Sequence, residues 1–128
     1  MRLLDNNCDV KTLSPLALAF VGDAVYELLV RDKIICEANR PAKFLHSESV
    51  KYVKADAQAA AYKKIEEHLN EEEVNVFKRG RNAHPGHVPK NADPADYHTA
   101  TGFEALLGYL YLTDRTDRIK ELFAIISE

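Results

Sequence analysis

Two acidic residues, Asp23 and Glu104, stand inside strongly apolar stretches with helical spacing, and their types suit divalent-metal chemistry. A carboxylate in apolar surroundings is costly unless a proton, a cation or several hydrogen bonds compensate its charge. Gly22 directly precedes the first acid, and Gly108 follows the second by one turn. Glycine in a helix is tolerated where two backbones approach closely. We therefore expect the two helices to cross and to pool their carboxylates around Mg²⁺, which takes oxygen ligands and keeps several waters.

The same pattern has a plainer interpretation, in which each acid is an ordinary polar residue at a helix contact, and the two interpretations are about equally weighted. Glu27 lies one turn after Asp23 and could join it, although a surface pair with Arg31 suits it better. If the acids do meet, a divalent metal between them would activate water for attack on phosphorus.

A basic segment, residues 78–92, precedes the helix that carries Glu104 and contains no acid. A run of this kind is more often a solvated loop, but its length and its position favour a function. His84 and His87 in this segment are too few for a zinc site, which needs three or four ligands. The residues of this segment expected to contact phosphate groups are Lys78, Arg79, Arg81, Asn82 and Lys90.

The composition limits the class of protein. With 128 residues, 46 % hydrophobic and 29 % charged, the chain is expected to form a single globular domain, 1–128. No apolar run approaches the roughly 20 residues that cross a bilayer, and no signal-peptide pattern begins the chain. Cys8 and Cys36 have no motif spacing, which indicates a reducing, cytoplasmic setting without membrane contact. The net charge of −3 means that nucleic-acid binding would need a local basic patch.

The hydrophobic spacing predicts an all-α fold with no strand, internal repeat or second domain. Ser14 and Pro15 mark the start of the first long helix, and the prolines and glycines of residues 80–95 predict an irregular loop. Asp114 or Thr116 is expected to cap the last helix. The expected helices cover residues 15–32, two units within 42–69 that meet near 54–56, 70–79, 96–112, and the stretch after 116.

The motifs and their order resemble the catalytic domain of the ribonuclease III family over essentially the whole chain. Residues 20–25, Phe-Val-Gly-Asp-Ala-Val, are similar to the family's first acidic motif, and residues 104–108, Glu-Ala-Leu-Leu-Gly, to its second. Residues 45–53 are similar to the middle helix. The resemblance implies an all-helical, dimeric bundle with Phe20 at the dimer interface. It also implies that Asp23 and Glu104 are the catalytic metal ligands, and that the enzyme cuts double-stranded RNA with Mg²⁺ or Mn²⁺, leaving 5′-phosphate and 3′-hydroxyl ends. The phosphate contacts expected of the basic segment would then be contacts with RNA.

The chain departs from the usual four-acid site of that family. Leu16, Ala19 and Thr101 stand where family members carry acids, so a second metal should bind poorly, although the Thr101 hydroxyl could still reach a metal-bound water. The basic segment and the absence of a double-stranded-RNA-binding domain before the chain ends at Glu128 resemble the mini-ribonuclease III subtype. That subtype implies maturation of the 23S ribosomal RNA precursor, with ribosomal proteins as candidate partners.

Two other classes of function stay open at this point. The first is a noncatalytic RNA-binding or ribosome-assembly module with the same fold, which would keep its role without Asp23. The second is an unrelated helical metal hydrolase acting on small nucleotides. That class usually presents several acids on one helix face, whereas Glu71, Glu72 and Glu73 stand at a helix start, where the helix dipole accounts for them.

Overall fold

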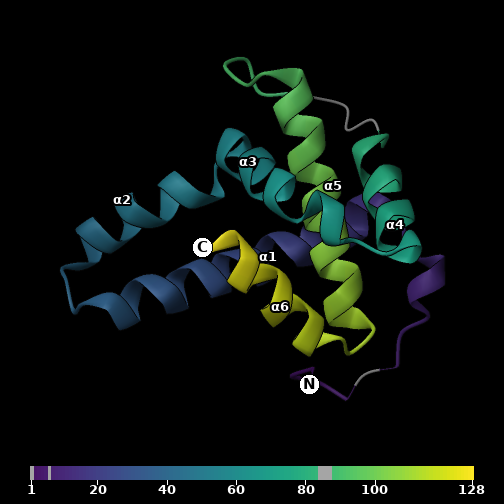
Figure 1. The fold of residues 1–128 in the computed structure, drawn as a ribbon, viewed down its shortest axis with the longest axis horizontal. Helices are drawn as coiled ribbons and strands as arrows, with labels where there is room; N and C mark the ends of the chain where they lie inside the picture. Colours follow the sequence, from purple (N-terminus) through teal and green to yellow (C-terminus); the bar gives the residue numbers. More distant parts are fainter. Residues whose placement is uncertain (1, 6, 84–87) are drawn as a thin grey trace.

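One central helix, α5 (Pro94–Leu112), organises the fold, and most of the other helices pack around it (Figure 1). The computed structural model describes residues 2–5, 7–83 and 88–128, and this part of the chain contains helices and no strand. None of the described helices is both long and apolar enough to cross a membrane. The elements are η1 (Val10–Thr12), α1 (Pro15–Glu37), α2 (Ala42–Val53), α3 (Ala55–Ile65), η2 (Glu66–His68), α4 (Glu71–Arg81), α5 (Pro94–Leu112) and α6 (Thr116–Ile126).

The central position of α5 follows from its composition. Its residues from Ala100 to Gly108 are buried almost without interruption, and a helix that is apolar on all sides must be covered on all sides. Helices α1, α3, α4 and α6 each contact it, while α2 folds back along the distal half of α1 (Figure 1). The acid of α5 therefore lies where several elements converge.

Helices α1 and α5 cross at the two glycines, as the sequence predicts. A Cβ atom built on Gly22 would lie 1.6 Å from the carbonyl oxygen of Glu104, and one on Gly108 would lie 2.0 Å from that of Leu18. These contacts are with backbone atoms, which cannot move aside as a side chain can. The two backbones therefore touch, and only glycine allows this crossing.

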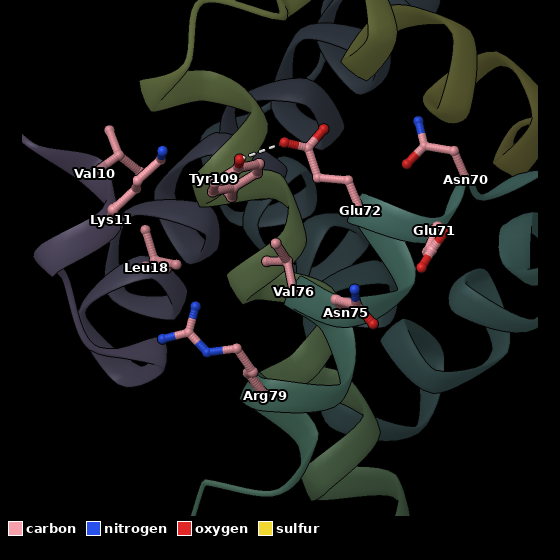
Figure 2. Close-up of a pocket in the computed structure, with 10 residues that line it drawn as sticks. All are labelled: Val10, Lys11, Leu18, Asn70, Glu71, Glu72, Asn75, Val76, Arg79 and Tyr109. Atoms are coloured by element: carbon pink, nitrogen blue, oxygen red, sulfur yellow. Dashed lines mark hydrogen bonds between the residues drawn. The ribbon is translucent and has the colours of Figure 1, made fainter.

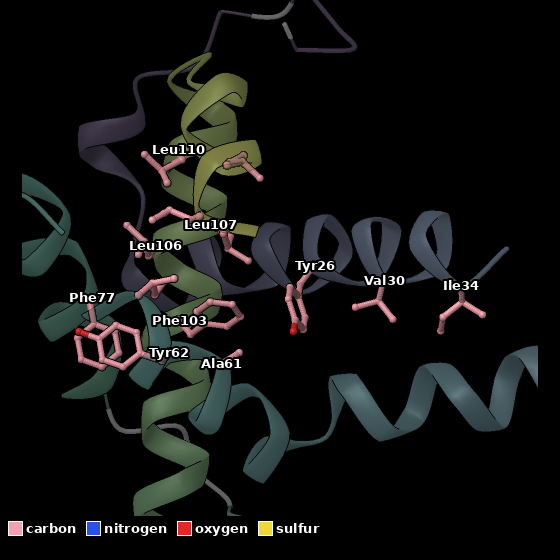
Figure 3. Packing of buried hydrophobic residues seen from close by; sticks show 13 residues of the cluster. Tyr26, Val30, Ile34, Ala61, Tyr62, Phe77, Phe103, Leu106, Leu107 and Leu110 are labelled. Atoms are coloured by element: carbon pink, nitrogen blue, oxygen red, sulfur yellow. The ribbon is translucent and has the colours of Figure 1, made fainter. Parts of the chain in front are cut away.

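Aromatic contacts hold the remaining helices onto the crossing. Tyr26 of α1 meets Phe103 of α5 edge to face, with ring centroids 5.0 Å apart. Tyr62 of α3 stacks on Phe77 of α4 at 3.8 Å. Figure 3 shows these side chains in one continuous cluster, with Ile34 extending it along α1 toward α2. The cluster thus fixes α3 and α4 relative to the helix that carries Glu104.

Three helix boundaries differ from those expected. Helix α1 continues past Asp32 to Glu37 because Ile34 is buried and extends the apolar face of the helix. Helix α4 reaches Arg81, and basic side chains in a last turn favour a helix C-terminus. Helix α5 begins at Pro94, where the Asp93 side chain accepts a hydrogen bond from the Ala95 amide. The predicted irregular segment is correspondingly shorter.

The other boundaries mostly follow the sequence pattern. The break between α2 and α3 falls at Lys54, and Asn70 and Glu73 form the expected capping box at the start of α4. The expected cap of α6 is wrong, because the helix begins at Thr116 and its N-cap residue is Arg115. Asp114 instead has a φ of 61°, so it makes the left-handed turn between α5 and α6.

The ion pair between Glu73 of α4 and Arg118 of α6 is largely buried. The Glu73 carboxylate, 1 % exposed, accepts hydrogen bonds from two nitrogens of Arg118, at 2.8 Å from Nε and 2.9 Å from the second guanidinium nitrogen. Burial opposes ionisation of Glu73, but the hydrogen bonds from Arg118 and from the Asn70 backbone outweigh it and hold its pKa below the usual range. The pair thereby joins α4 to α6.

Replacing Arg118 with methionine is expected to lower the free energy of unfolding by about 3 kcal/mol, because the buried Glu73 carboxylate loses its partner. The matched control is Glu121→Gln, which removes only the exposed partner of the same arginine and should cost less than about 1 kcal/mol. Since the folded pKa of Glu73 lies below its unfolded value, its stabilisation is present at neutral pH and fades below roughly pH 4. Urea unfolding of both variants at pH 7 and pH 3.5 checks this, and equal losses for the two variants at pH 7 would contradict it.

Candidate active site

The helix crossing brings Asp23 and Glu104 together. Asp23 follows Gly22 on α1, and the carboxyl groups of the two acids are close enough to share a hydrogen bond. The prediction that the acids of two separate helices meet is in accord with this geometry. The surroundings differ from those expected, however, because Asp23 and its neighbour Ala24 are exposed. The apolar stretch of α1 continues around the helix onto a solvent-facing side, so the pair is open to solvent on the Asp23 side and covered on the Glu104 side.

The electrostatics of this carboxyl pair favour the binding of a cation. Burial is the main reason that the pKa of Glu104 rises to about 8, and the neighbouring Asp23 carboxyl group raises it further. A hydrogen bond from Gln58 acts in the opposite direction. Two adjacent carboxylates repel each other unless a proton or a cation lies between them. The donor set, carboxylate oxygens at a solvent-open edge, fits Mg²⁺ or Mn²⁺.

A buried glutamine completes the surroundings of Glu104. Gln58 of α3 is 2 % exposed, and its amide nitrogen donates to Glu104 Oε2 at 3.2 Å and to the Val53 carbonyl at 2.8 Å. Its amide oxygen is buried and has no hydrogen-bond partner in the described part of the chain. The sequence analysis missed this residue. The available signal was weak: one long polar side chain in an alanine-rich helix.

The described residues bring no third acid, histidine or cysteine to the pair. Glu27 forms the expected surface pair with Arg31, at 2.7 Å. Thr101 is buried, and its hydroxyl donates to the Tyr97 carbonyl of its own helix at 3.0 Å. The side chain of Thr101 is thus already hydrogen-bonded within α5.

The basic residues predicted to contact RNA lie on different sides of α4. Arg79 lines a cavity of about 620 Å³ together with Lys11 and Tyr109 (Figure 2). Arg81 instead lies over the Phe77 ring, 5.7 Å from its centroid. Three of these residues, Lys78, Arg79 and Arg81, belong to the last turn of α4, which extends the expected helix to Arg81, a residue of the predicted loop. Asn82 is its C-cap, Lys90 is exposed beyond it, and His84 and His87 lie outside the described residues.

Of these cations, Arg81 is connected most directly to the acid pair. The Phe77 ring beneath it stacks on Tyr62 of α3, and Arg81 also lowers the pKa of Tyr62 against the larger effect of burial. One turn earlier on α3 is Gln58, which contacts Glu104. Arg81 therefore lies on the α3 side of α4, whereas Arg79 faces the N-terminal segment (Figure 2).

Comparisons with known proteins define the class to which this arrangement belongs. The sequence profile of the family described as Ribonuclease III domain matches residues 16–115, which include both acids. The chain belongs to the ribonuclease III family. The crystal structure of a protein from Fusobacterium nucleatum has the same fold, with a TM-score of 0.85 and 32 % identity over 94 % of this chain and 98 % of that one.

Within the family, the similarity is to the Mini-ribonuclease 3 proteins. The Mini-ribonuclease 3 of a Thermoanaerobacter species is 52 % identical over 116 residues, which are 91 % of this chain and 82 % of that protein. The Mini-ribonuclease 3 of Clostridium tetani is 44 % identical over 92 % of this chain and 79 % of its own length. The resemblance inferred from the acidic motifs is thereby confirmed, and so is the all-α ribonuclease III fold.

Proposed function

We propose that this protein is a metal-dependent endoribonuclease that cleaves double-stranded RNA. The observation that carries the proposal is the Asp23–Glu104 carboxyl pair, held at a glycine crossing in a chain of the ribonuclease III family. The proposed natural substrate is the 23S ribosomal RNA precursor, supported by the similarity to the Mini-ribonuclease 3 proteins. Ribosomal proteins are candidate partners for presenting it. The proposed location is the cytoplasm, in keeping with two exposed, unpaired cysteines, Cys8 and Cys36.

In the proposed mechanism, Asp23 and Glu104 hold Mg²⁺, for which Mn²⁺ can substitute. When bound, the metal supplies an activated water and positive charge against the scissile phosphate. Glu104, anchored in the core, fixes the position of the pair, and exposed Asp23 faces the arriving RNA backbone. Hydrolysis would join the water oxygen to phosphorus, break the bond to the 3′ oxygen and transfer a proton from the water to that leaving oxygen. The products then carry a 5′-phosphate and a 3′-hydroxyl.

The substrate class is tested by incubating the protein with long double-stranded RNA, the matching single strand and double-stranded DNA. We expect cleavage of the RNA duplex alone, in Mg²⁺ and not in EDTA. Tight duplex binding without cleavage under every metal condition would favour the noncatalytic RNA-binding module instead. Cleavage of small nucleotides but not of duplexes would favour the unrelated hydrolase.

Arg81 is expected to contact the RNA backbone, because A-form duplexes are recognised largely through phosphates and 2′-hydroxyls. Charge reversal by Arg81→Glu should weaken duplex binding about tenfold and reduce the salt dependence of binding by about one unit of log–log slope. Lys120→Glu, on the exposed surface of α6, makes the same change in net charge and is the control. Arg79→Glu measures whether the cation on the other side of α4 contributes. Equal effects of Arg81→Glu and Lys120→Glu in a filter-binding titration would remove Arg81 from the interface.

We also propose that the protein is a homodimer. One side of α1 presents an exposed stripe whose apolar members include Phe20, Leu28 and Ile35, which are 82 %, 63 % and 46 % exposed. An apolar groove of about 640 Å³ between α1 and α2 adjoins its distal end. An unpartnered stripe of this kind is typical of an association surface. A second copy would cover it and would place two acid pairs for the two strands of a duplex.

Phe20→Asp is therefore expected to convert a dimer into a monomer at micromolar concentration, because it places a charge within the contact. Leu3→Asp is the matched control, since Leu3 is also 82 % exposed and lies outside α1, where its amide donates to the Tyr111 hydroxyl. Sedimentation velocity measures both. The dimer proposal is overturned if the unmodified protein sediments as a monomer, and Phe20 loses its role if Phe20→Asp stays dimeric.

A further inference from the structure

The amide of Gln58 can adopt only one orientation in this fold. Both partners of its nitrogen are acceptors, the Glu104 carboxylate and the Val53 carbonyl, so the nitrogen must face them. The amide oxygen is consequently left without a donor among the described residues, in a side chain that is 2 % exposed. Buried polar atoms are rarely left unpaired, and an exception of this kind calls for an unseen partner.

The position of that oxygen limits what its partner can be. The oxygen and the nitrogen are bonded to the same carbon, so the oxygen also lies near the Glu104 carboxyl group that the nitrogen contacts. When a cation lies between the acids, both are ionised, and the oxygen cannot interact favourably with carboxylates, which are acceptors only. It can interact with a hard cation, for which amide oxygens are ordinary ligands, or with a water in the shell of that cation. A neutral amide adds this oxygen without adding a third negative charge to Asp23 and Glu104.

We propose that Gln58 is a positioning residue of the acid pair, whose nitrogen orients the Glu104 carboxylate and whose oxygen helps to hold the hydrated divalent cation. This inference rests on the proposed function, because it assumes that a cation binds between the acids. It assigns a role to α3 in the site, which otherwise consists of residues from α1 and α5. In the competing explanation, which is structural, Gln58 only joins the end of α2 to α3 through Val53.

The first test compares Mn²⁺ affinity, measured by electron paramagnetic resonance, in the unmodified protein and in Gln58→Met. Methionine keeps the length of the side chain and removes both hydrogen-bonding atoms. We expect the affinity to fall roughly 10- to 100-fold, the range observed when partners of metal ligands are removed. The control is Ser49→Ala, which also removes a buried polar group but one whose hydroxyl donates only to the His46 carbonyl of its own helix, α2. Its Mn²⁺ affinity should stay within about twofold of the unmodified protein.

Thermal unfolding without metal separates the structural explanation from the proposed role. If Gln58→Met is less stable but binds Mn²⁺ as tightly as the unmodified protein, Gln58 is structural and the inference is wrong. If the unmodified protein itself does not bind Mn²⁺, the proposed function fails first, and that outcome is distinct from equal binding by both proteins.

A second measurement needs no variant and decides the matter if Gln58→Met does not fold. Gln58 is the single glutamine of the chain, so selective ¹⁵N labelling of the glutamine side chain yields one amide signal without any assignment. We expect that signal to shift on titration with Mg²⁺, at the same midpoint as Mg²⁺ displacement of bound Mn²⁺. A signal that does not move at saturating Mg²⁺ overturns the inference.

Discussion

Replacing Asp23 with asparagine is expected to reduce cleavage of double-stranded RNA at least about 1,000-fold, equivalent to roughly 4 kcal/mol of transition-state stabilisation. The described residues offer only one other carboxylate at the site, so the loss of a single charge removes half of the charged metal ligands. The fold should not suffer. In the absence of metal, asparagine removes a carboxyl group that crowds Glu104, and stability is expected to stay level or rise.

The control for this variant is Glu27→Gln, one turn further along the same helix. It removes the same charge, but from a surface pair with Arg31, and cleavage should stay within about twofold of normal. Single-turnover cleavage rates and thermal unfolding of both variants make the comparison. If Asp23→Asn retained cleavage, or lost it only by unfolding, Asp23 would not be a ligand in the reaction.

Adding one methyl group at Gly22 is expected to have the largest effect on stability. Gly22→Ala would place a carbon 1.6 Å from the Glu104 carbonyl oxygen and 2.5 Å from its carbonyl carbon, so α1 and α5 would have to move apart. We expect the free energy of unfolding to fall by about 4 kcal/mol or more, which is a large share of a small domain's stability. Gly108→Ala tests the crossing from the other helix, where the Leu18 carbonyl oxygen is 2.0 Å away.

The sign of the change makes this prediction easy to contradict. At an uncrowded position within a helix, the same substitution stabilises by about 1 kcal/mol, since alanine has the higher helix propensity. Urea unfolding of Gly22→Ala that showed unchanged or increased stability would mean that the helices are not in backbone contact. The acids would then lack the support that brings them together.

The helix crossing was predictable because it depends on residues with few alternatives. An acid and a nearby glycine are both unfavourable within an apolar helix, and the sequence has this combination at Asp23 and again at Glu104. A crossing of the two helices at their glycines accounts for both occurrences. The presence of each helix was likewise predictable from the spacing of its apolar residues. The ends of α1 and α4 were not, because they depend on packing and charge beyond the local pattern. The exposure of Asp23 depends on which side of α1 meets the core, and an apolar stretch that surrounds the helix does not specify that side.

The partners of the buried acids Glu104 and Glu73 could not be predicted from the sequence, because they come from distant elements. Gln58 reaches Glu104 across 46 positions of sequence, and its amide has meaning only once α3 lies on α5. Arg118 reaches Glu73 across 45 positions, so the acid that looked like a simple helix-start residue is also half of a buried ion pair. In both cases the residue type is ordinary, and the tertiary contact alone gives it a role.

The central claim is that Asp23 and Glu104 bind a divalent metal between them, and locating that metal tests it most directly. Crystals of the protein grown with Mn²⁺, and of Asp23→Asn under the same conditions, would be measured at the manganese absorption edge. We expect one anomalous peak between the two carboxylates of the unmodified protein and none at that place in the variant. The account would be contradicted if the unmodified protein showed no manganese between these carboxylates, or if it bound manganese elsewhere and still cleaved RNA.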